Sequence, residues 1–190
     1  MNTKSILIVG VGGQGVLRAS DILCRAMMIS GLDVKKSEVH GMAQRGGCVT
    51  SHVRYGRKVY SPLAKKGDCD ILISFEKMET LRYLDYLRED GGIIINGEEI
   101  YPPVVNLGAT TYSRGVIETV QSCFQNVQEI NGPALAREAG SIKTVNTILL
   151  GALSTRLTVD EEAWEKALVE SFPSNLLEIN RKAFQLGKKT

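Results

Sequence analysis

The sequence predicts an α/β protein with a doubly wound, mostly parallel but mixed sheet, helices on both faces and a helical C-terminal third. Three observations predict this fold. Short β-rich apolar runs alternate with helix-length apolar patterns along the first half of the chain. The expected strands lack strict polar alternation, which is typical of strands buried on both faces. A glycine-rich loop joins the first strand to the first helix, and this combination is Rossmann-like.

The first half of the chain alternates strands and helices. An apolar run at 5–9 predicts the first strand, and helical spacing of apolar residues predicts a helix over 15–30. Further strands are expected at 33–37, 48–55, 70–75 and 92–96, with a helix at 78–87. Residues 55–59 indicate a hairpin-like turn between Val53 and Tyr60, so we expect one antiparallel pair within the mixed sheet.

The second half is mainly helical. After Pro102 and Pro103 we expect a strand at 110–112, a helix at 114–125, a strand at 127–130 and a helix at 133–139. Helical spacing then predicts helices at 143–153, 160–170 and 175–186. Thr158 and Glu161 have the spacing of a capping box before the second of these. Because no linker, repeat or low-complexity tract interrupts the pattern, we expect one domain over residues 1–190.

Composition and charge argue against several functional classes. The chain has 190 residues, of which 43% are hydrophobic, so it can bury a substantial core. Its 23 Lys and Arg against 21 Asp and Glu leave a net charge of +2, far from the basic field that nucleic acids or anionic membranes require. The longest apolar runs are much shorter than the roughly 20 residues that span a bilayer, and no leader-cleavage pattern follows the N-terminus. We therefore expect a cytoplasmic protein with no nucleic-acid or membrane partner.

The cysteine pattern does not indicate a metal site. The four cysteines are Cys24, Cys48, Cys69 and Cys123, and none forms a Cys-x-x-Cys pair or a cluster with histidine. Zinc and iron–sulfur sites require such clusters. We therefore expect buried, reduced thiols and no metal bound by this chain alone.

The glycine-rich loop after the first strand is the first candidate site. Its sequence at 10–15 is Gly-Val-Gly-Gly-Gln-Gly, and the helix begins directly after it. Glycines allow a tight turn and let backbone N–H groups approach an anion, while the positive end of the helix dipole attracts phosphate or carboxylate. The candidate cofactor-binding residues are Gly10, Gly12, Gly13, Gln14 and Gly15.

A dinucleotide site of this kind also needs an acidic residue about 20 positions further along. Glu38 stands there, but Lys35 and Lys36 beside it suit a phosphate or solvent better than a ribose. A stand-alone NAD(P)-binding oxidoreductase or a nucleotide-binding module therefore remains an alternative at this point. A glycine turn that serves only strand–helix packing is another.

The second candidate site is the polar loop at 37–47, Ser-Glu-Val-His-Gly-Met-Ala-Gln-Arg-Gly-Gly. Loops at the carboxyl ends of parallel strands line the ligand crevice of doubly wound sheets, so we expect this loop beside the glycine-rich turn. The planar fork of Arg45 suits a carboxylate or phosphate, or it pairs with a neighbouring carboxylate that ties the loop down. The candidate residues of this active-site or partner loop are Glu38, His40, Gln44, Arg45, Gly46 and Gly47.

These two loops, with Tyr-Ser-Pro-Leu at 60–63 and Glu-Lys-Met-Glu-Thr-Leu-Arg-Tyr-Leu at 76–84, resemble a known family. It is that of the gamma-type subunits of 2-oxoacid:ferredoxin oxidoreductases, and the beta subunits of its indolepyruvate branch are the most similar. The resemblance covers residues 4–190 in length and order, with its specific motifs in the first half. It implies a share in the oxidative decarboxylation of a 2-oxoacid, such as indolepyruvate or another arylpyruvate, to an acyl-CoA with reduction of ferredoxin.

The resemblance also implies that the chain is inactive alone and contributes no catalytic residue. Members of the family use thiamine diphosphate and pass electrons to iron–sulfur clusters. This sequence lacks the diphosphate–magnesium motif, of which residues 67–70 are at best a fragment, and it lacks cluster cysteines. We therefore expect thiamine diphosphate, Mg and 4Fe–4S clusters on a large alpha subunit, with CoA as a candidate ligand at a shared site. An isolated chain with an uncovered docking face is expected to form a homodimer.

Overall fold

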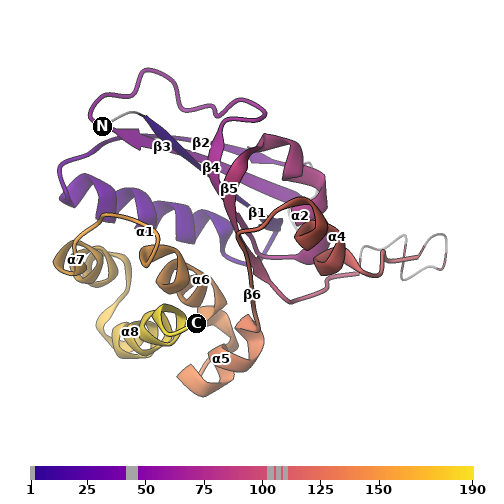
Figure 1. Ribbon diagram of the computed structural model, residues 1–190. Helices are drawn as coiled ribbons and strands as arrows, with labels where there is room; N and C mark the ends of the chain where they lie inside the picture. Colours follow the sequence, from indigo (N-terminus) through magenta and orange to yellow (C-terminus); the bar gives the residue numbers. More distant parts are fainter. Residues whose placement is uncertain (1–2, 42–46, 102–104, 106–107, 109–110) are drawn as a thin grey trace.

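A mixed β-sheet forms the centre of the protein. The computed structural model describes residues 3–41, 47–101, 105, 108 and 111–190 (Figure 1). Within this part of the chain the strand order is β2-β3-β1-β4-β5-β6. The strands are β1 (Lys4–Val11), β2 (Asp33–His40), β3 (Cys48–Gly56), β4 (Cys69–Ser74), β5 (Leu87–Asn96) and β6 (Val127–Ile130).

One strand of the sheet is reversed. β1, β4, β5 and β6 pair in parallel, whereas β3 is antiparallel to both β1 and β2. Because β3 alone is reversed, β2 ends at the same edge of the sheet as β1 and β4. The loops that follow these strands therefore share one edge, as the sequence predicted.

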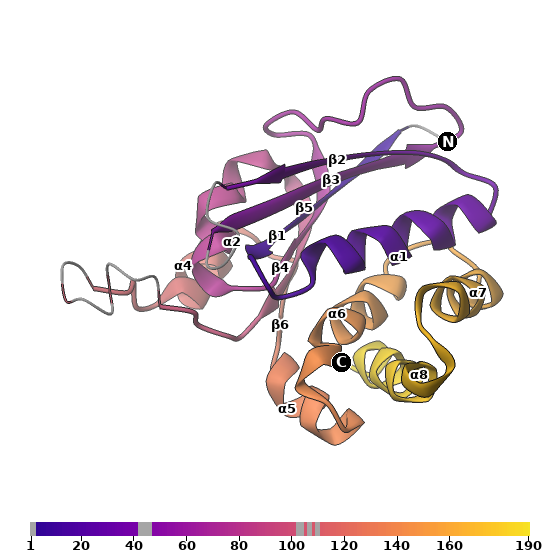
Figure 2. The same cartoon turned by 180° about the vertical axis from the view of Figure 1, so that it is seen from behind.

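Helices cover both faces of the sheet (Figures 1 and 2). α1 (Val16–Ile29) and the C-terminal helices lie on one face, and α2 (Lys77–Tyr83) and α4 (Val116–Cys123) on the other. Within β1, Ile6 and Ile8 belong to the first core and Leu7 and Val9 to the second, and all four are fully buried. This burial on both faces explains why the strand shows no polar alternation.

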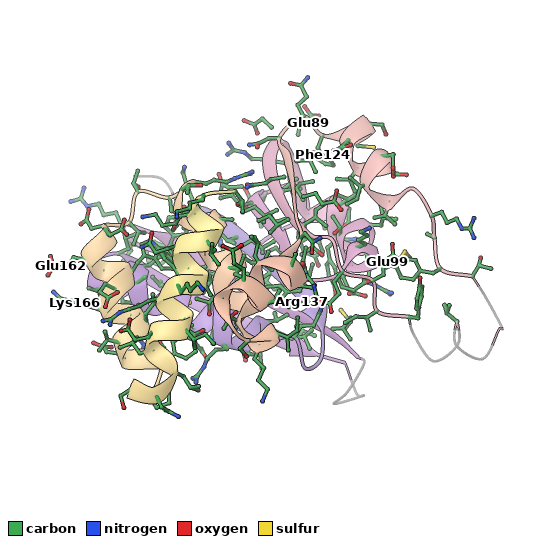
Figure 3. The ribbon with its side chains drawn as sticks, turned by 90° about the horizontal axis from the view of Figure 1, so that it is seen from below. Glu89, Glu99, Phe124, Arg137, Glu162 and Lys166 are labelled. Atoms are coloured by element: carbon green, nitrogen blue, oxygen red, sulfur yellow. The ribbon has the colours of Figure 1, made fainter. Side chains whose placement is uncertain are left out.

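The C-terminal third forms a compact helical layer. Its helices are α5 (Gly132–Ala139), α6 (Val145–Ser154), α7 (Glu161–Ser171) and α8 (Ser174–Lys188). Short 3₁₀ turns, η1 (Leu84–Tyr86) and η2 (Ile142–Thr144), precede β5 and α6. Figure 3 shows Glu162 and Lys166 on the outer side of this layer, where they form an ion pair of 2.8 Å along α7. No helix among the described residues is both long and apolar enough to cross a membrane.

Several local predictions are wrong. The helix expected at 78–87 ends at Tyr83, and Leu87 already belongs to β5. Residues 57–68 form no strand, so the hairpin expected at 55–59 is absent and the two antiparallel pairs involve β3 with β1 and β2. Side chains hold this segment as a loop: Asp33 accepts a hydrogen bond from Val59 N (2.9 Å), and Arg54 donates to the carbonyl of Ser61 (3.2 Å). Residues 111–112 are not a strand, and residue 110 lies outside the described residues. The N-cap of α7 is Asp160 rather than Thr158.

His52 lies beneath this loop and makes stability depend on pH. It is 6% exposed, its Nδ1 accepts a hydrogen bond from Ala64 N (3.3 Å), and burial lowers the pKa of its imidazole. The imidazole binds a proton more readily in the unfolded chain than in the folded one. The stabilisation from burying neutral His52 is therefore complete above the unfolded pKa of about 6.5, and it is lost as the pH falls through the lower pKa of the folded state. We expect the unfolding free energy, measured by urea titration, to fall more steeply below about pH 6.5 in the wild type than in His52→Asn, which keeps an acceptor. Equal slopes in the two proteins would contradict this assignment.

Candidate functional site

The glycine-rich turn lies at the carboxyl edge of the sheet, between β1 and α1. Gly10 packs closely, since a β-carbon there would lie 2.8 Å from Phe75 Cβ and 2.8 Å from Val16 Cγ2. Gly15 caps α1 with a φ of +84°, and a β-carbon on it would lie 2.9 Å from the Asn146 amide. Gly13 has a φ of +103° and open space around the position of a β-carbon. The turn therefore uses Gly10 and Gly15 for packing and leaves Gly13 facing open space.

A pocket of about 400 Å³ opens at this turn. α6 begins at Val145 in its wall, so the N-termini of α1 and α6 meet there. Partial positive charge at both helix starts and the ammonium group of Lys143 favour an anion. The residues that line the pocket are Gly13, Gln14, Gly15, Glu98, Ile142, Lys143 and Val145.

Lys143 was not predicted from the sequence. It stands far along the chain, and only tertiary packing brings η2 and the start of α6 to the glycine-rich turn. Ser141 and Thr144 were the available signal, because such residues often mark a helix start, as Ser141 does here by accepting a hydrogen bond from Lys143 N (3.3 Å).

Gln14 points into the protein. Its Oε1 accepts a hydrogen bond from Val11 N (2.8 Å), and its Nε2 donates to Phe75 O (2.8 Å) and Glu98 Oε2 (3.2 Å). Asn96 at the end of β5 donates to the same two acceptors, at 3.0 and 3.2 Å. This network joins the turn to the ends of β4 and β5. It also supplies two amide donors to the Glu98 carboxylate, which reduces the repulsion that Glu98 would exert on an anion in the pocket.

The polar loop after β2 meets the glycine-rich turn. Gly12 N donates a hydrogen bond to Gly47 O (2.8 Å), and Gly41 N donates to Cys48 O (2.9 Å). The backbone of His40 ends β2. Gln44, Arg45 and Gly46 lie outside the described residues, so their contacts remain predictions. The start of the loop was predicted at Ser37, but β2 continues to His40, so Glu38 and His40 belong to the strand and the loop begins at Gly41. The two candidate sites nevertheless meet at Gly12 and Gly47, as predicted.

Glu38 does not occupy the position of a ribose-binding acid. It forms an ion pair with Lys36 (2.6 Å), and Lys36 also binds Asp21. β3 lies between β2 and β1 in the sheet, so the strand that carries Glu38 is not the neighbour of the strand that leads into the glycine-rich turn. A dinucleotide site places these strands side by side. The geometry therefore disfavours the NAD(P) alternative.

All four cysteines are free. Cys24 and Cys69 are buried, and burial raises the pKa of each thiol to about 12. Among the described residues, no three or more His, Cys, Asp or Glu side chains gather as a metal site. The described part of this chain therefore offers no ligand set that fits an iron–sulfur cluster.

Comparison with known proteins decides the family. The family model described as pyruvate ferredoxin/flavodoxin oxidoreductase matches residues 5–190. The chain belongs to this family. Members with similar sequences include the indolepyruvate oxidoreductase subunits IorB of Thermococcus kodakarensis, 37% identical over 199 residues, and Archaeoglobus fulgidus, 37% identical over 187. The first alignment covers 100% of this chain and 96% of the relative, and the second covers 96% and 92%. The resemblance stated from the sequence motifs is thus confirmed.

Solved structures of the oxidoreductase family share this fold. The gamma subunit of a keto/oxoacid ferredoxin oxidoreductase from Geobacter sulfurreducens matches with a TM-score of 0.71 and 26% identity, covering 98% of this chain and 96% of that one. The 2-oxoglutarate:ferredoxin oxidoreductase of Magnetococcus marinus, with 2-oxoglutarate, coenzyme A and succinyl-CoA bound, matches with a TM-score of 0.76 and 21% identity. That likeness concerns the fold alone. It covers 100% of this chain but 31% of the Magnetococcus chain, so the same fold also occurs as one part of a longer polypeptide.

Proposed function

We propose that this chain is the small subunit of an indolepyruvate:ferredoxin oxidoreductase and is inactive without a larger partner subunit. The observation that carries the proposal is 37% identity, over the whole chain, to a protein named as an indolepyruvate oxidoreductase subunit. The proposal includes a cytoplasmic location, supported by four free cysteines, which are typical of a reducing compartment.

The proposed roles of the two subunits rest on the family of this chain and on the absence of a metal-binding cluster among its described residues. Thiamine diphosphate with Mg and 4Fe–4S clusters, held by the larger subunit, would supply the decarboxylation chemistry and accept the electrons on their way to ferredoxin. This chain would complete the active site by docking, by covering it from water and by binding an anionic group of the acyl acceptor, coenzyme A.

The pocket at the glycine-rich turn is the proposed site for a CoA phosphate group. Within the described residues, the backbone N–H of Gly13 donates to no acceptor, and Lys143 lines the same pocket. Two helix N-termini add attraction for negative charge. Arg45 is proposed as a second cationic group, because its loop ends at Gly47, which is hydrogen-bonded to Gly12.

Co-expression with the larger subunit tests the assignment. We expect the two chains to co-purify, and we expect indolepyruvate- and CoA-dependent reduction of ferredoxin under anaerobic conditions only when both are present. A failure to associate, together with NAD(P) binding by this chain alone, would overturn the proposal in favour of a stand-alone dehydrogenase.

The CoA role has a separate test. Gly12→Asp adds a carboxylate where the loop meets the turn, and Arg45→Ala removes the proposed fork. Each variant is expected to weaken CoA binding to the complex by about tenfold, equivalent to about 1.4 kcal/mol. Calorimetric titration measures this affinity, on variant complexes that contain the same subunits as the wild-type complex. Unchanged affinity in both variants would disprove the CoA site and leave the subunit assignment intact.

A further inference from the structure

A partly buried polar cluster links β3 to α2, away from the lining of the glycine-rich pocket. It consists of Cys48 and Thr50 on β3 with Glu79 and Tyr83 on α2. Thr50 Oγ1 donates a hydrogen bond to the Tyr83 hydroxyl (2.8 Å), and the same hydroxyl lies 2.9 Å from Cys48 Sγ. Thr50 is 3% exposed and Glu79 is 5% exposed, whereas Cys48 and Tyr83 are partly buried, so the cluster lies at the edge of the core.

Glu79 has one carboxylate oxygen without a standard partner. Arg82 Nε donates to its Oε1 (3.2 Å), but the buried Oε2 has no hydrogen bond of standard geometry among the described residues. A buried carboxylate oxygen without a donor is destabilising. Burial, followed by an interaction with Glu79, raises the pKa of the Cys48 thiol above its ordinary value.

The Thr50 hydroxyl donates to the Tyr83 hydroxyl, and either partner can donate in the contact between Tyr83 and Cys48. Because Thr50 donates to Tyr83, the Tyr83 phenol is free to donate its own proton to Cys48 Sγ. Burial and the contact with Cys48 raise the pKa of Tyr83 to about 12, so the phenol keeps its proton at neutral pH.

Cys48 stands where the polar loop ends. Its carbonyl oxygen accepts a hydrogen bond from Gly41 N (2.9 Å), and its backbone pairs with Val11 of β1. The preceding residue, Gly47, accepts the hydrogen bond from Gly12 at the glycine-rich turn. A side-chain anchor at Cys48 therefore sets the position of both ends of the loop.

We infer that Cys48 is a positioning residue, whose side chain ties the start of β3 to Tyr83 of α2 and so holds Gly47 against Gly12. Its expected effect on ligand binding rests on the proposed CoA role of the glycine-rich turn. The hydrogen-bond chain itself does not rest on that role, so it is tested separately.

Thiol reactivity tests the chain of hydrogen bonds. The full-length protein is treated with iodoacetamide at increasing pH, and modification of each cysteine is followed by peptide mass spectrometry, with exposed Cys123 as the internal reference. We expect Cys48 to react more slowly and with a higher pH midpoint than Cys123. In Tyr83→Phe the Cys48 midpoint should rise, because the thiolate loses the Tyr83 donor, while that of Cys123 stays the same. Matching profiles for the two cysteines in the wild type, or no shift in Tyr83→Phe, would overturn the inference.

Steady-state kinetics of the complex tests the positioning role. Cys48→Ala is expected to raise the KM for CoA about tenfold with little change in kcat, since a displaced loop weakens binding. Cys48→Ser keeps a donor and should restore the KM to within about twofold, and Cys123→Ala serves as the control. Equal loss in the Ser and Ala variants, or no change in Cys48→Ala, would overturn positioning by the thiol. If Gly12→Asp also leaves CoA binding unchanged, the CoA proposal has failed, and the thiol titration still decides whether the anchor exists.

Discussion

Gly151→Ala is expected to lower the unfolding free energy by about 3 kcal/mol, although glycine-to-alanine changes inside helices usually stabilise. α6 and α8 cross at this residue. A β-carbon on Gly151 would lie 2.1 Å from Phe184 O, and one on Gly187, on the opposite helix, would lie 1.9 Å from Ile148 O. Because both obstacles are backbone atoms, no side-chain rotation relieves the clash. The two helices would have to separate and lose buried contacts.

Urea unfolding of the full chain measures this effect. The midpoint should fall in Gly151→Ala with little change in slope. Asn175→Ala is the matched control, because it adds the same residue type at an exposed position of α8 and should shift stability by no more than about 0.5 kcal/mol. An unchanged or increased midpoint in Gly151→Ala would show that the helices do not pack as closely as the structure indicates.

The elements that the sequence predicts correctly are set by local patterns. The apolar run of β1, the glycine-rich turn and the spacing of α1 lie within one short segment, so propensity and pattern determine them together. The helical layer was predicted for the same reason. The contact between Gly151 and Gly187 was not, since a single helical glycine has no pattern that reveals which backbone it approaches.

The place of β3 in the sheet depends on distant contacts. The sequence suggested a turn at 55–59, yet β3 inserts between β1 and β2 and pairs with both. A hairpin is readily predicted when a two-residue turn such as Asn-Gly or Asp-Gly joins its strands. β2 and β3 are instead joined by the polar segment 41–47, which has no such signal and which the sequence marked as a binding loop.

In the candidate site, too, local sequence patterns predicted some contacts, and distant packing determined others. The sequence predicted that the glycine-rich turn and the polar loop would meet, and the hydrogen bond between Gly12 and Gly47 confirms this. It assigned Gln14 to ligand binding, but the Gln14 amide is occupied by Val11, Phe75 and Glu98. Lys143 was absent from the prediction because it reaches the pocket only through the packing of the helical layer.

Gly13→Asp is expected to weaken CoA binding to the complex roughly thirtyfold, equivalent to about 2 kcal/mol. Gly13 lines the pocket and has open space at the position of its β-carbon, so a carboxylate fits there without a steric clash. It would add negative charge opposite Lys143 at the site where we propose that a CoA phosphate binds. The existing Glu98 carboxylate accepts two amide hydrogen bonds, whereas the new carboxylate would have no comparable donors.

Gly13→Asn separates charge from backbone strain. Asparagine has nearly the same size as aspartate, and both tolerate positive φ better than most residues, so the two variants carry similar strain at the φ of +103°. Calorimetric titration of the complex with CoA should therefore show a modest loss for Asn and the large loss for Asp, with the difference reduced at high salt. Equal losses in the two variants would mean that the turn acts through its shape. In that case the anion would bind elsewhere, and the pocket would serve the contact between the glycine-rich turn and the helical layer.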